Sequence, residues 1–338
     1  GMIVSNIGVT PDFSAIYTSN SAQHTATVQV NLKDGHEVGS YPYMDRVRAA
    51  MAEEMPQMTA YFQSGGLVDA VLNLGLPAPI DVQVSGSNLE QTYEIACRLS
   101  EKVHAIEGVS QVYMPQDVDY PALRLNIDRA RAGLLGLTQK EVIQSIITSL
   151  TSNQMIAPSF WVDPKSGIDY MLTVQYPEGQ IRTINDLRAI PLRGTGRNEP
   201  TRLDAITAIR RINAPTEVDH YQLRRVIDIY VGLAGEDLGR VTSRIEAIVK
   251  DMQLPEGVRV DLRGMVQGMR ASFRSFALGL IIAVVLLYLI LVAQFRSFVD
   301  PALILLAIPT GVTGVFATLV STGTSLNVMS LMGVVMMS

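Results

Sequence analysis

The sequence has 338 residues, a net charge of −5 and 48% hydrophobic residues. This length predicts two or more domains, and a negative net charge without a Lys/Arg run argues against nucleic-acid binding. The single cysteine, Cys97, excludes an internal disulfide and a thiolate metal cluster.

The first third of the chain alternates strands with amphipathic helices. Alternating apolar and polar residues predict strands at 25–32, 80–85 and 109–114. Helices are predicted between them, at about 43–55 and 89–106, where Pro56 and Gly108 act as stop signals. The same strand–helix–strand layout recurs at 226–231, 238–252 and 255–262.

The middle of the chain contains one more such unit and an interruption. A strand is predicted at 122–127, and Thr138 with Glu141 forms a capping box that opens a helix to about Leu150. From about 160 to 221, prolines and glycines predict a smaller inserted subdomain with an exposed hairpin at 192–202. Trp161 is expected in the core of this subdomain, or alternatively at an interface. Together these units predict an α+β fold built from repeated split-βαβ (ferredoxin-like) sandwiches.

The C-terminal part of the sequence predicts a hairpin of two membrane-spanning helices. Residues 276–338 contain only two charged side chains, Arg296 and Asp300. The apolar runs on either side of them, 276–293 and 301–320, are near the roughly 20 residues that a bilayer-spanning helix needs. A third apolar stretch begins at 326, and Gly1 before Met2 looks like a cloning scar, so we expect a piece of a longer protein.

No enzymatic motif is present. The sequence has no Walker loop or Gly-x-Ser-x-Gly elbow, and its four histidines lack metal-ligand spacing. The one suggestive cluster is a helical face formed by Met44, Met51, Met55 and Met58. Thioethers suit Cu(I) or Ag(I), which would make Met55 and Met58 metal ligands. Methionine also fills cores, and we favour that interpretation.

Several motifs of this chain resemble the resistance-nodulation-division (RND) efflux transporters of the AcrB/AcrD/AcrF type. In the apolar part these are RASFRSF at 270–276, AQFRSFVDP at 293–301 and TSLNVMSLMG at 324–333. Upstream they are LRLNIDR at 123–129, LGLTQKEV at 135–142 and LDAI at 203–206. The resemblance covers essentially the whole chain and implies the C-terminal half of an internally duplicated transporter.

The resemblance implies a domain layout. It implies porter and docking subdomains, namely a first porter subdomain at 1–117, a second at 118–162 and 222–270, and an inserted docking subdomain at 163–221. It implies transmembrane helix eight at 271–295, helix nine at 300–321 and the start of helix ten at 326–338. The chain would then lie in a bacterial inner membrane, with residues 1–270 in the periplasm.

The resemblance also implies a function. The complete protein would be a proton-driven secondary transporter, not an enzyme, that exports hydrophobic or amphiphilic compounds toward an outer-membrane channel without a cofactor. Its partners would be its own N-terminal half, further copies in a homotrimer, a periplasmic adaptor protein, the outer-membrane channel and membrane lipid. The alternatives are a heavy-metal (Cu/Ag) exporter of the same family and a non-transporting, membrane-anchored assembly subunit.

Substrate-contacting positions follow from the same resemblance. In multidrug members these contacts cluster on a switch loop, which here matches about 9–23 and holds Phe13, Ile16 and Tyr17. The adjoining strand positions match Gln29, Ile80 and Val82. The best-known drug pumps carry phenylalanines at these strand positions, so this chain offers less aromatic surface. Ile80 and Val82 are alternatively core residues of their strand, and we favour that interpretation.

Overall fold

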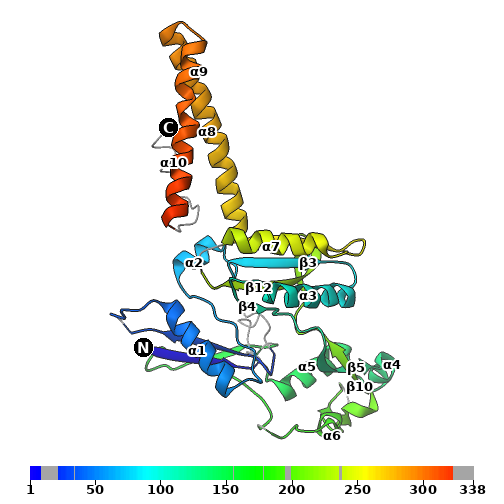
Figure 1. Ribbon diagram of the computed structural model, residues 1–338. Helices are drawn as coiled ribbons and strands as arrows, with labels where there is room; N and C mark the ends of the chain where they lie inside the picture. The colour runs from blue at the N-terminus through cyan, green and yellow to red at the C-terminus, as the bar shows by residue number, and fades with distance from the viewer. Residues whose placement is uncertain are drawn as a thin grey trace. The chain divides into compact units, whose positions relative to one another are not determined.

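The structure is a computed structural model that describes residues 1–8, 22–33, 35–154, 156–177, 179–194, 199–235 and 238–322, without the side chains of 307–312 and 315–316. Contacts between Cα atoms divide the chain into two units. The first contains Gly1–His36 and Gln116–Val218, and the second contains Glu37–Pro115 and Asp219–Ser338. Each unit mixes helices and strands (Figure 1), as the sequence predicts.

The second unit is built around a five-stranded antiparallel sheet. Its strands are β3 (Ile80–Ser85), β4 (Val109–Tyr113), β11 (Asp219–Tyr221), β12 (Arg224–Leu233) and β13 (Arg259–Gly264). Strand β3 pairs with β12 and β13, and β12 also pairs with β4. With the helices α3 (Leu89–His104) and α7 (Leu238–Asp251), the units β3–α3–β4 and β12–α7–β13 therefore interleave their strands, which is the arrangement of a split-βαβ fold.

This sheet joins segments from both sides of the predicted boundary at 117. Val226 on β12 lies opposite Ser85 on β3, and the pairing continues to Val231 opposite Ile80. The predicted layout separates 80–113 from 222–270, whereas the observed sheet combines them. Hydrophobic periodicity identifies each strand but carries no information about which distant strand completes the sheet.

Two helices cover the apolar face of the sheet, α3 (Leu89–His104) and α7 (Leu238–Asp251); α3 contacts β3 and β12, and α7 packs against α3 (Figure 1). The buried apolar side chains come from alternate strand positions and from one stripe of each helix: Ile80, Val82, Val84, Ile227, Ile229, Ile95, Leu99, Val103, Val241 and Ile245. Each buried aliphatic side chain contributes about 1.5–3 kcal/mol. The Asn88 side chain caps α3 by accepting a hydrogen bond from the Gln91 amide (3.2 Å).

The described residues of the first unit form four two-stranded sheets. They pair β1 (Met2–Ile7) with β2 (Ala26–Asn31), β5 (Tyr120–Ile127) with β10 (Thr207–Ala214), β6 (Ser159–Val162) with β7 (Asp169–Leu172), and β8 (Pro191–Leu192) with β9 (Thr201–Arg202). Its helices are α4 (Arg129–Leu134), α5 (Gln139–Leu150), α6 (Ile184–Arg188) and the short 3₁₀ turn η2 (Leu203–Ala205). Its core gathers Ala132, Leu137, Val142, Ile146, Leu187, Ile190, Leu192, Leu203 and Ile206.

Two sequence-based expectations for the first unit have opposite outcomes. The capping box of α5 is confirmed, because Thr138 and Glu141 exchange hydrogen bonds between side chain and backbone. The expectation that Trp161 lies in a core is wrong, since its side chain is 54% exposed on β6. All residues of β6 and β7 are exposed, and Trp161 contacts Tyr170 across this hairpin (6.0 Å between ring centroids).

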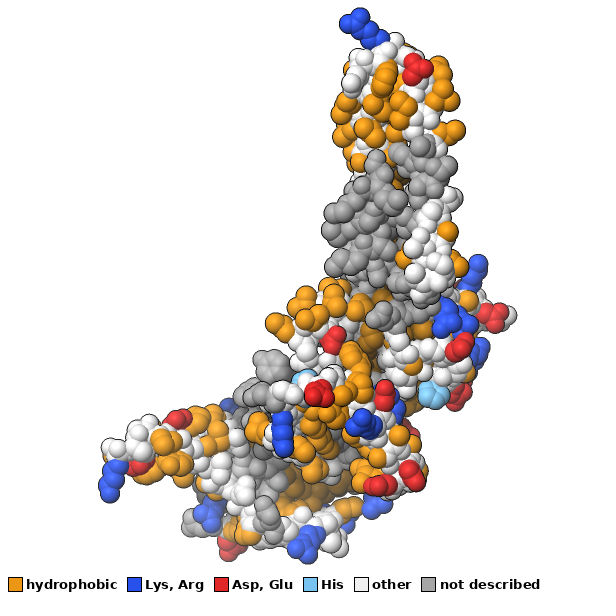
Figure 2. All heavy atoms as spheres, turned by 60° about the vertical axis from the view of Figure 1, so that its left-hand side comes forward, with side chains coloured by type: hydrophobic (Ala, Val, Ile, Leu, Met, Phe, Trp, Pro, Cys, Tyr) orange, Lys and Arg blue, Asp and Glu red, His pale blue; other side chains and the backbone are white. Residues whose placement is uncertain are grey.

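The remaining elements of the second unit are α1 (Ser40–Glu54), α2 (Leu67–Leu72), α8 (Met265–Phe295), α9 (Val299–Leu305) and α10 (Ala307–Thr322). Among the described residues one helix, α8, is by itself long and apolar enough to cross a membrane, with a mean hydropathy of 3.1 over its most apolar stretch. None of that stretch is buried, and Figure 2 shows many apolar side chains at the top of the view, where the end of α8 and α9 lie. α9 contacts α8, and the Tyr288 hydroxyl donates to the Phe298 carbonyl (3.1 Å) where the chain reverses.

The second predicted span, 300–321, differs from the expectation of one continuous helix. The structure divides it at Leu306 into α9 and α10, and neither part alone reaches spanning length. Pro309 explains the position of the break, because proline has no amide hydrogen to donate to the carbonyl four residues earlier, at Leu305. The predicted start of a further helix at 326–338 lies outside the described residues.

Candidate functional site

Of the six predicted substrate-contacting residues, the structure describes Gln29, Ile80 and Val82. Phe13, Ile16 and Tyr17 lie outside the described residues. Gln29 is exposed on β2, opposite Val4, and belongs to the first unit.

Ile80 and Val82 are core side chains. Both lie on the helix-covered face of β3, in the second unit, with 0% of their surface exposed. This agrees with the alternative interpretation of these two positions. Their side chains offer no surface to a substrate in this arrangement.

The methionine face of α1 is not a core stripe. Helix α1 buries none of its residues, so that interpretation is wrong. Met55 ends the helix with its side chain 43% exposed, and Met58 follows with 58% exposed. Met51 and Met55 line a shallow groove of about 230 Å³ with Arg46, Val47, Ala50 and Glu54. Within the described part of the chain, no group of three or more His, Cys, Asp or Glu residues could hold a metal ion.

The sheet of the second unit has a polar face that the sequence analysis did not identify. Asp81 and Gln83 alternate with the core residues of β3 and therefore point away from the covering helices. Asp228 on β12 lies opposite Gln83, and the Gln83 side-chain amide donates a hydrogen bond to the Asp228 carboxylate (Nε2 to Oδ1, 2.7 Å). The alternation of β3 was visible in the sequence, but the carboxylate from 145 residues away was not.

This polar face carries a fully buried carboxyl group, that of Asp81. Asp81 has 0% of its surface exposed. Burial raises the pKa of its carboxyl to about 8, the nearby charge of Asp228 adds to this, and Arg263 opposes it. Strongly perturbed carboxyls of this kind concentrate at functional sites, although structural charge networks also perturb pKa values.

A tyrosine cluster packs beside these carboxyls. The Tyr61 ring stacks on Tyr113 (5.4 Å between centroids) and lies 5.9 Å from Tyr230. The Tyr61 hydroxyl donates to the Pro77 carbonyl (3.1 Å). The Gln111 side chain fixes the next residue, Phe62, by donating to its carbonyl (2.6 Å) and accepting from its amide (3.0 Å). These contacts hold the segment around Tyr61 against the edge of the sheet.

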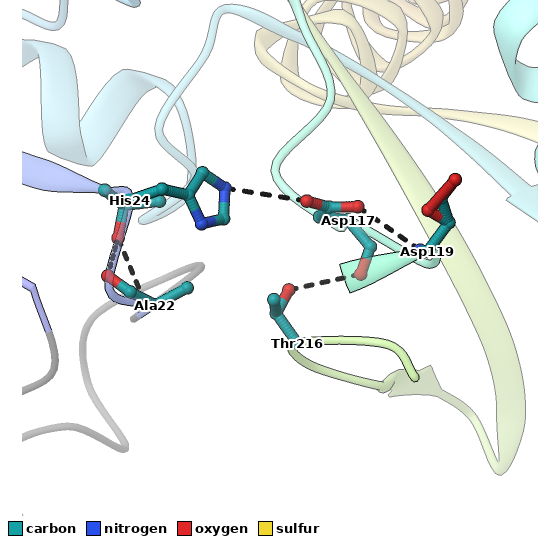
Figure 3. Close-up of polar contacts among 6 residues, drawn as sticks. Ala22, His24, Asp117, Asp119 and Thr216 are labelled. Carbon is teal, nitrogen blue, oxygen red and sulfur yellow. Dashed lines mark hydrogen bonds and ion pairs between the residues drawn. The ribbon is translucent and has the colours of Figure 1, made fainter. Parts of the chain in front are cut away.

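The first unit has a smaller polar contact of its own (Figure 3). The His24 ring points toward the Asp117 carboxylate (Nε2 to Oδ2, 3.5 Å) and stacks on Tyr120 (5.0 Å). Thr216 donates through its amide to the Asp117 carbonyl (2.9 Å), and the Asp119 amide donates to the Asp117 carboxylate (3.3 Å). Both side chains of the ion pair are substantially exposed, so the pair contributes at most about 1 kcal/mol.

A protein-family model matches nearly the whole chain, and known proteins match most of it. The family model described as the AcrB/AcrD/AcrF family matches residues 4–338. The cobalt-zinc-cadmium resistance protein CzcA of Cupriavidus metallidurans is 22% identical over 71% of this chain and 23% of its own length. The nickel and cobalt resistance protein CnrA of the same organism is 25% identical over 72% of this chain and 23% of its own length.

Solved structures give the same result for the fold. A crystal structure of a heavy metal efflux pump matches 98% of this chain and 34% of its own, with a TM-score of 0.73 and 19% identity. A second crystal form of a heavy metal efflux pump matches 91% of this chain and 32% of its own chain, with a TM-score of 0.72 and 21% identity. The chain thus spans about a quarter of the curated relatives and a third of the solved structures. Because the family model covers residues 4–338, the chain belongs to the AcrB/AcrD/AcrF family of RND efflux pumps.

Proposed function

We propose that the complete protein is a proton-driven exporter of hydrophobic or amphiphilic compounds and that this chain supplies part of its substrate path. The observation that carries the export function is the family match over residues 4–338. Pumps of this family lie in the inner membrane and have periplasmic domains. The exposed apolar surface of α8 supports membrane insertion of this chain.

The proposed layout places residues 1–270 in the periplasm, in porter subdomains and an inserted docking subdomain at 163–221, with 80–113 and 222–270 sharing the central sheet. The proposed partners are the protein's own N-terminal half, a trimer of copies, a periplasmic adaptor and an outer-membrane channel. The exposed Trp161 hairpin is consistent with such contacts, because large exposed apolar groups mark interaction surfaces.

The substrate class is proposed from this chain's own residues. The described part lacks a cluster of metal-binding side chains. The segment proposed to contact substrate contains Phe13, Ile16 and Tyr17, which are apolar or aromatic. Gln29, which follows this segment on β2, has an exposed side chain. Aromatic rings add about 0.5–1.5 kcal/mol beyond their buried area when they pack on flat compounds.

The test is deletion of the complete gene, followed by susceptibility measurements against amphiphilic drugs, detergents and metal salts. We expect lower tolerance of amphiphilic compounds, restored by the intact gene. Greater sensitivity to metals alone would replace this substrate class with the one below. Unchanged susceptibility to every compound and metal would favour the non-transporting assembly subunit.

The second candidate is export of metal cations. The names of CzcA and CnrA, which are metal-resistance proteins, are the specific observation that favours it. In this chain the exposed thioethers of Met55 and Met58 suit a soft cation such as Cu(I) or Ag(I). Calorimetry of the purified protein with Ag(I) tests it, using Met55→Leu/Met58→Leu against the exposed control Met171→Leu. Binding heat that survives the double substitution would remove Met55 and Met58 from this role.

A further inference from the structure

The buried carboxyl of Asp81 lies in the middle of three paired strands. In the register of the sheet, Asp81 is opposite Tyr230 on β12 and opposite Arg263 on β13. Its side chain is on the face that α3 and α7 do not cover, and yet it has no exposed surface. A charge in this position has lost its hydration and needs compensation from neighbouring groups.

That compensation is incomplete in the described structure. Both carboxylate oxygens of Asp81 are buried without a hydrogen-bond partner, and so is the side-chain oxygen of Gln83. The amide nitrogen of Gln83 is already used by Asp228. Three buried acceptor atoms therefore lie on one strand face without a well-formed hydrogen bond, although the Gln83 side chain is near enough to Asp81 to lower the pKa of its carboxyl slightly.

Arg263 does not supply the missing donor. Its guanidinium carbon lies 3.9 Å from the centre of the Tyr221 ring, and its Nε is itself buried without a partner. None of the ion pairs in the described part of the chain joins Arg263 to Asp81. Stacking on an aromatic ring is favourable for a guanidinium, so the cation is held beside the carboxyl without being hydrogen-bonded to it.

The groups that face Asp81 come from every neighbouring element. Strand β12 contributes Asp228 and Tyr230, strand β13 contributes Arg263 and the more exposed Asp261, and strands β4 and β11 contribute Tyr113 and Tyr221. The segment that packs over the tyrosines contributes Tyr61, whose pKa is raised by burial and by the charge of Asp81. The nearby formal charges are thus two buried carboxyls, one exposed carboxylate and one arginine.

We propose that Asp81 is a proton-binding site outside the membrane-spanning part of this protein, at which the carboxyl holds one proton and presents it to the buried oxygen of Gln83. The proton removes the uncompensated charge and provides the donor that Gln83 lacks. On release, the Asp81 O–H bond breaks, the proton passes to solvent water and the carboxylate keeps the electron pair. This inference does not depend on which substrate the complete protein exports.

A proton accounts for these observations better than a metal ion. The described residues contain no group of three metal-binding side chains, and the positive charge of Arg263 opposes a second cation. The raised pKa of Asp81, about 8, agrees with a carboxyl that is protonated in neutral solution. The folded state then binds a proton that the unfolded state releases at much lower pH, so stability falls as pH rises toward about 8 and levels off above it.

Infrared spectroscopy of the purified protein in lipid or detergent tests the proposal. A protonated buried carboxyl has a carbonyl stretch that an ionised carboxylate lacks, and ordinary carboxyls are already ionised at pH 6. We expect one such band at pH 6 that disappears on titration to pH 10. The band is absent from Asp81→Asn and present in Asp261→Asn, which removes an exposed carboxylate from the same face.

A second variant keeps the proposal falsifiable if Asp81→Asn does not fold. Asp228→Asn removes the negative charge that helps to raise the pKa of Asp81. The midpoint of the band should therefore move to lower pH in this variant. A wild-type protein without the band at pH 6, a band that persists in folded Asp81→Asn, or an unmoved midpoint in Asp228→Asn would overturn the assignment.

Discussion

Gln83 and Asp228, which lie 145 residues apart in the sequence, are joined by a buried hydrogen bond of 2.7 Å between neighbouring strands. The bond connects the two βαβ units whose strands interleave in the central sheet. It also satisfies one oxygen of a carboxylate that is almost completely buried. The polar face of the sheet therefore contributes to holding the two distant segments together.

Replacement of Gln83 by alanine tests this contribution. Because Asp228 stays buried and loses a donor, we expect the local free energy of unfolding of β3 and β12 to fall by about 1–3 kcal/mol. Hydrogen exchange of the β3 and β12 amides, read by mass spectrometry, measures the change. Gln91→Ala on the exposed face of α3 is the matched control and should leave these amides unaffected. Equal protection in both variants would show that the bond contributes nothing measurable.

The turn between β11 and β12 is strained because two residues other than glycine adopt left-handed backbone angles there. Gln222 and Leu223 both have positive φ angles, 49° and 64°, and the Leu223 side chain is 99% exposed. A two-residue hairpin of this type prefers Asn-Gly. We expect Gln222→Asn/Leu223→Gly to stabilise the hairpin by about 1 kcal/mol. Limited proteolysis at the turn should slow accordingly, whereas Leu223→Ala keeps the positive φ and should not slow it.

Gly264 connects the sheet to α8 and cannot carry a side chain without strain. Its φ is +86°, and an added Cβ would lie 2.8 Å from the Pro79 carbonyl oxygen, which accepts a hydrogen bond from Met265. We expect Gly264→Ala to destabilise the protein by about 1–3 kcal/mol. Gly268→Ala, four residues along α8 and free of close neighbours, should instead stabilise it by about 0.5–1 kcal/mol. Calorimetric melting in detergent should give a lower Tm than wild type for Gly264→Ala and a higher Tm for Gly268→Ala.

The capping box of α5 predicts a pH dependence. The Glu141 carboxylate accepts hydrogen bonds from the amide and the hydroxyl of Thr138, both at 2.8 Å, and these bonds hold its pKa below the ordinary glutamate value. A lowered pKa contributes stability above the unfolded pKa, and this contribution is lost as the pH falls through the folded pKa. Urea unfolding at pH 7 and pH 3 should show a larger loss for wild type than for Glu141→Gln. Identical losses would contradict a role for this carboxylate.

Local features of the fold were accessible from the sequence because they depend on near neighbours along the chain. The capping box of α5, the bounds of α3 and the apolar helix α8 follow from spacings of two to four residues or from one long apolar run. The break before α10 was missed although Pro309 is visible in the sequence, because the apolar run gives no sign of interruption. The family, too, was recognisable from motifs that lie within single segments.

Pairing and burial were decided by the tertiary structure. Methionines at helical spacing are equally compatible with a core stripe and with an exposed face, and only the exposure of α1 among the residues that the structure describes distinguishes them. Likewise, the alternation of β3 separates Ile80 and Val82 from Asp81 and Gln83 but does not say what covers each face. The approach of β12 and β13 from more than 130 residues away buries Asp81 beside Asp228 and Arg263. Spacing within one strand therefore determined which side chains share a face, and long-range strand pairing alone determined which of those faces holds a buried charge.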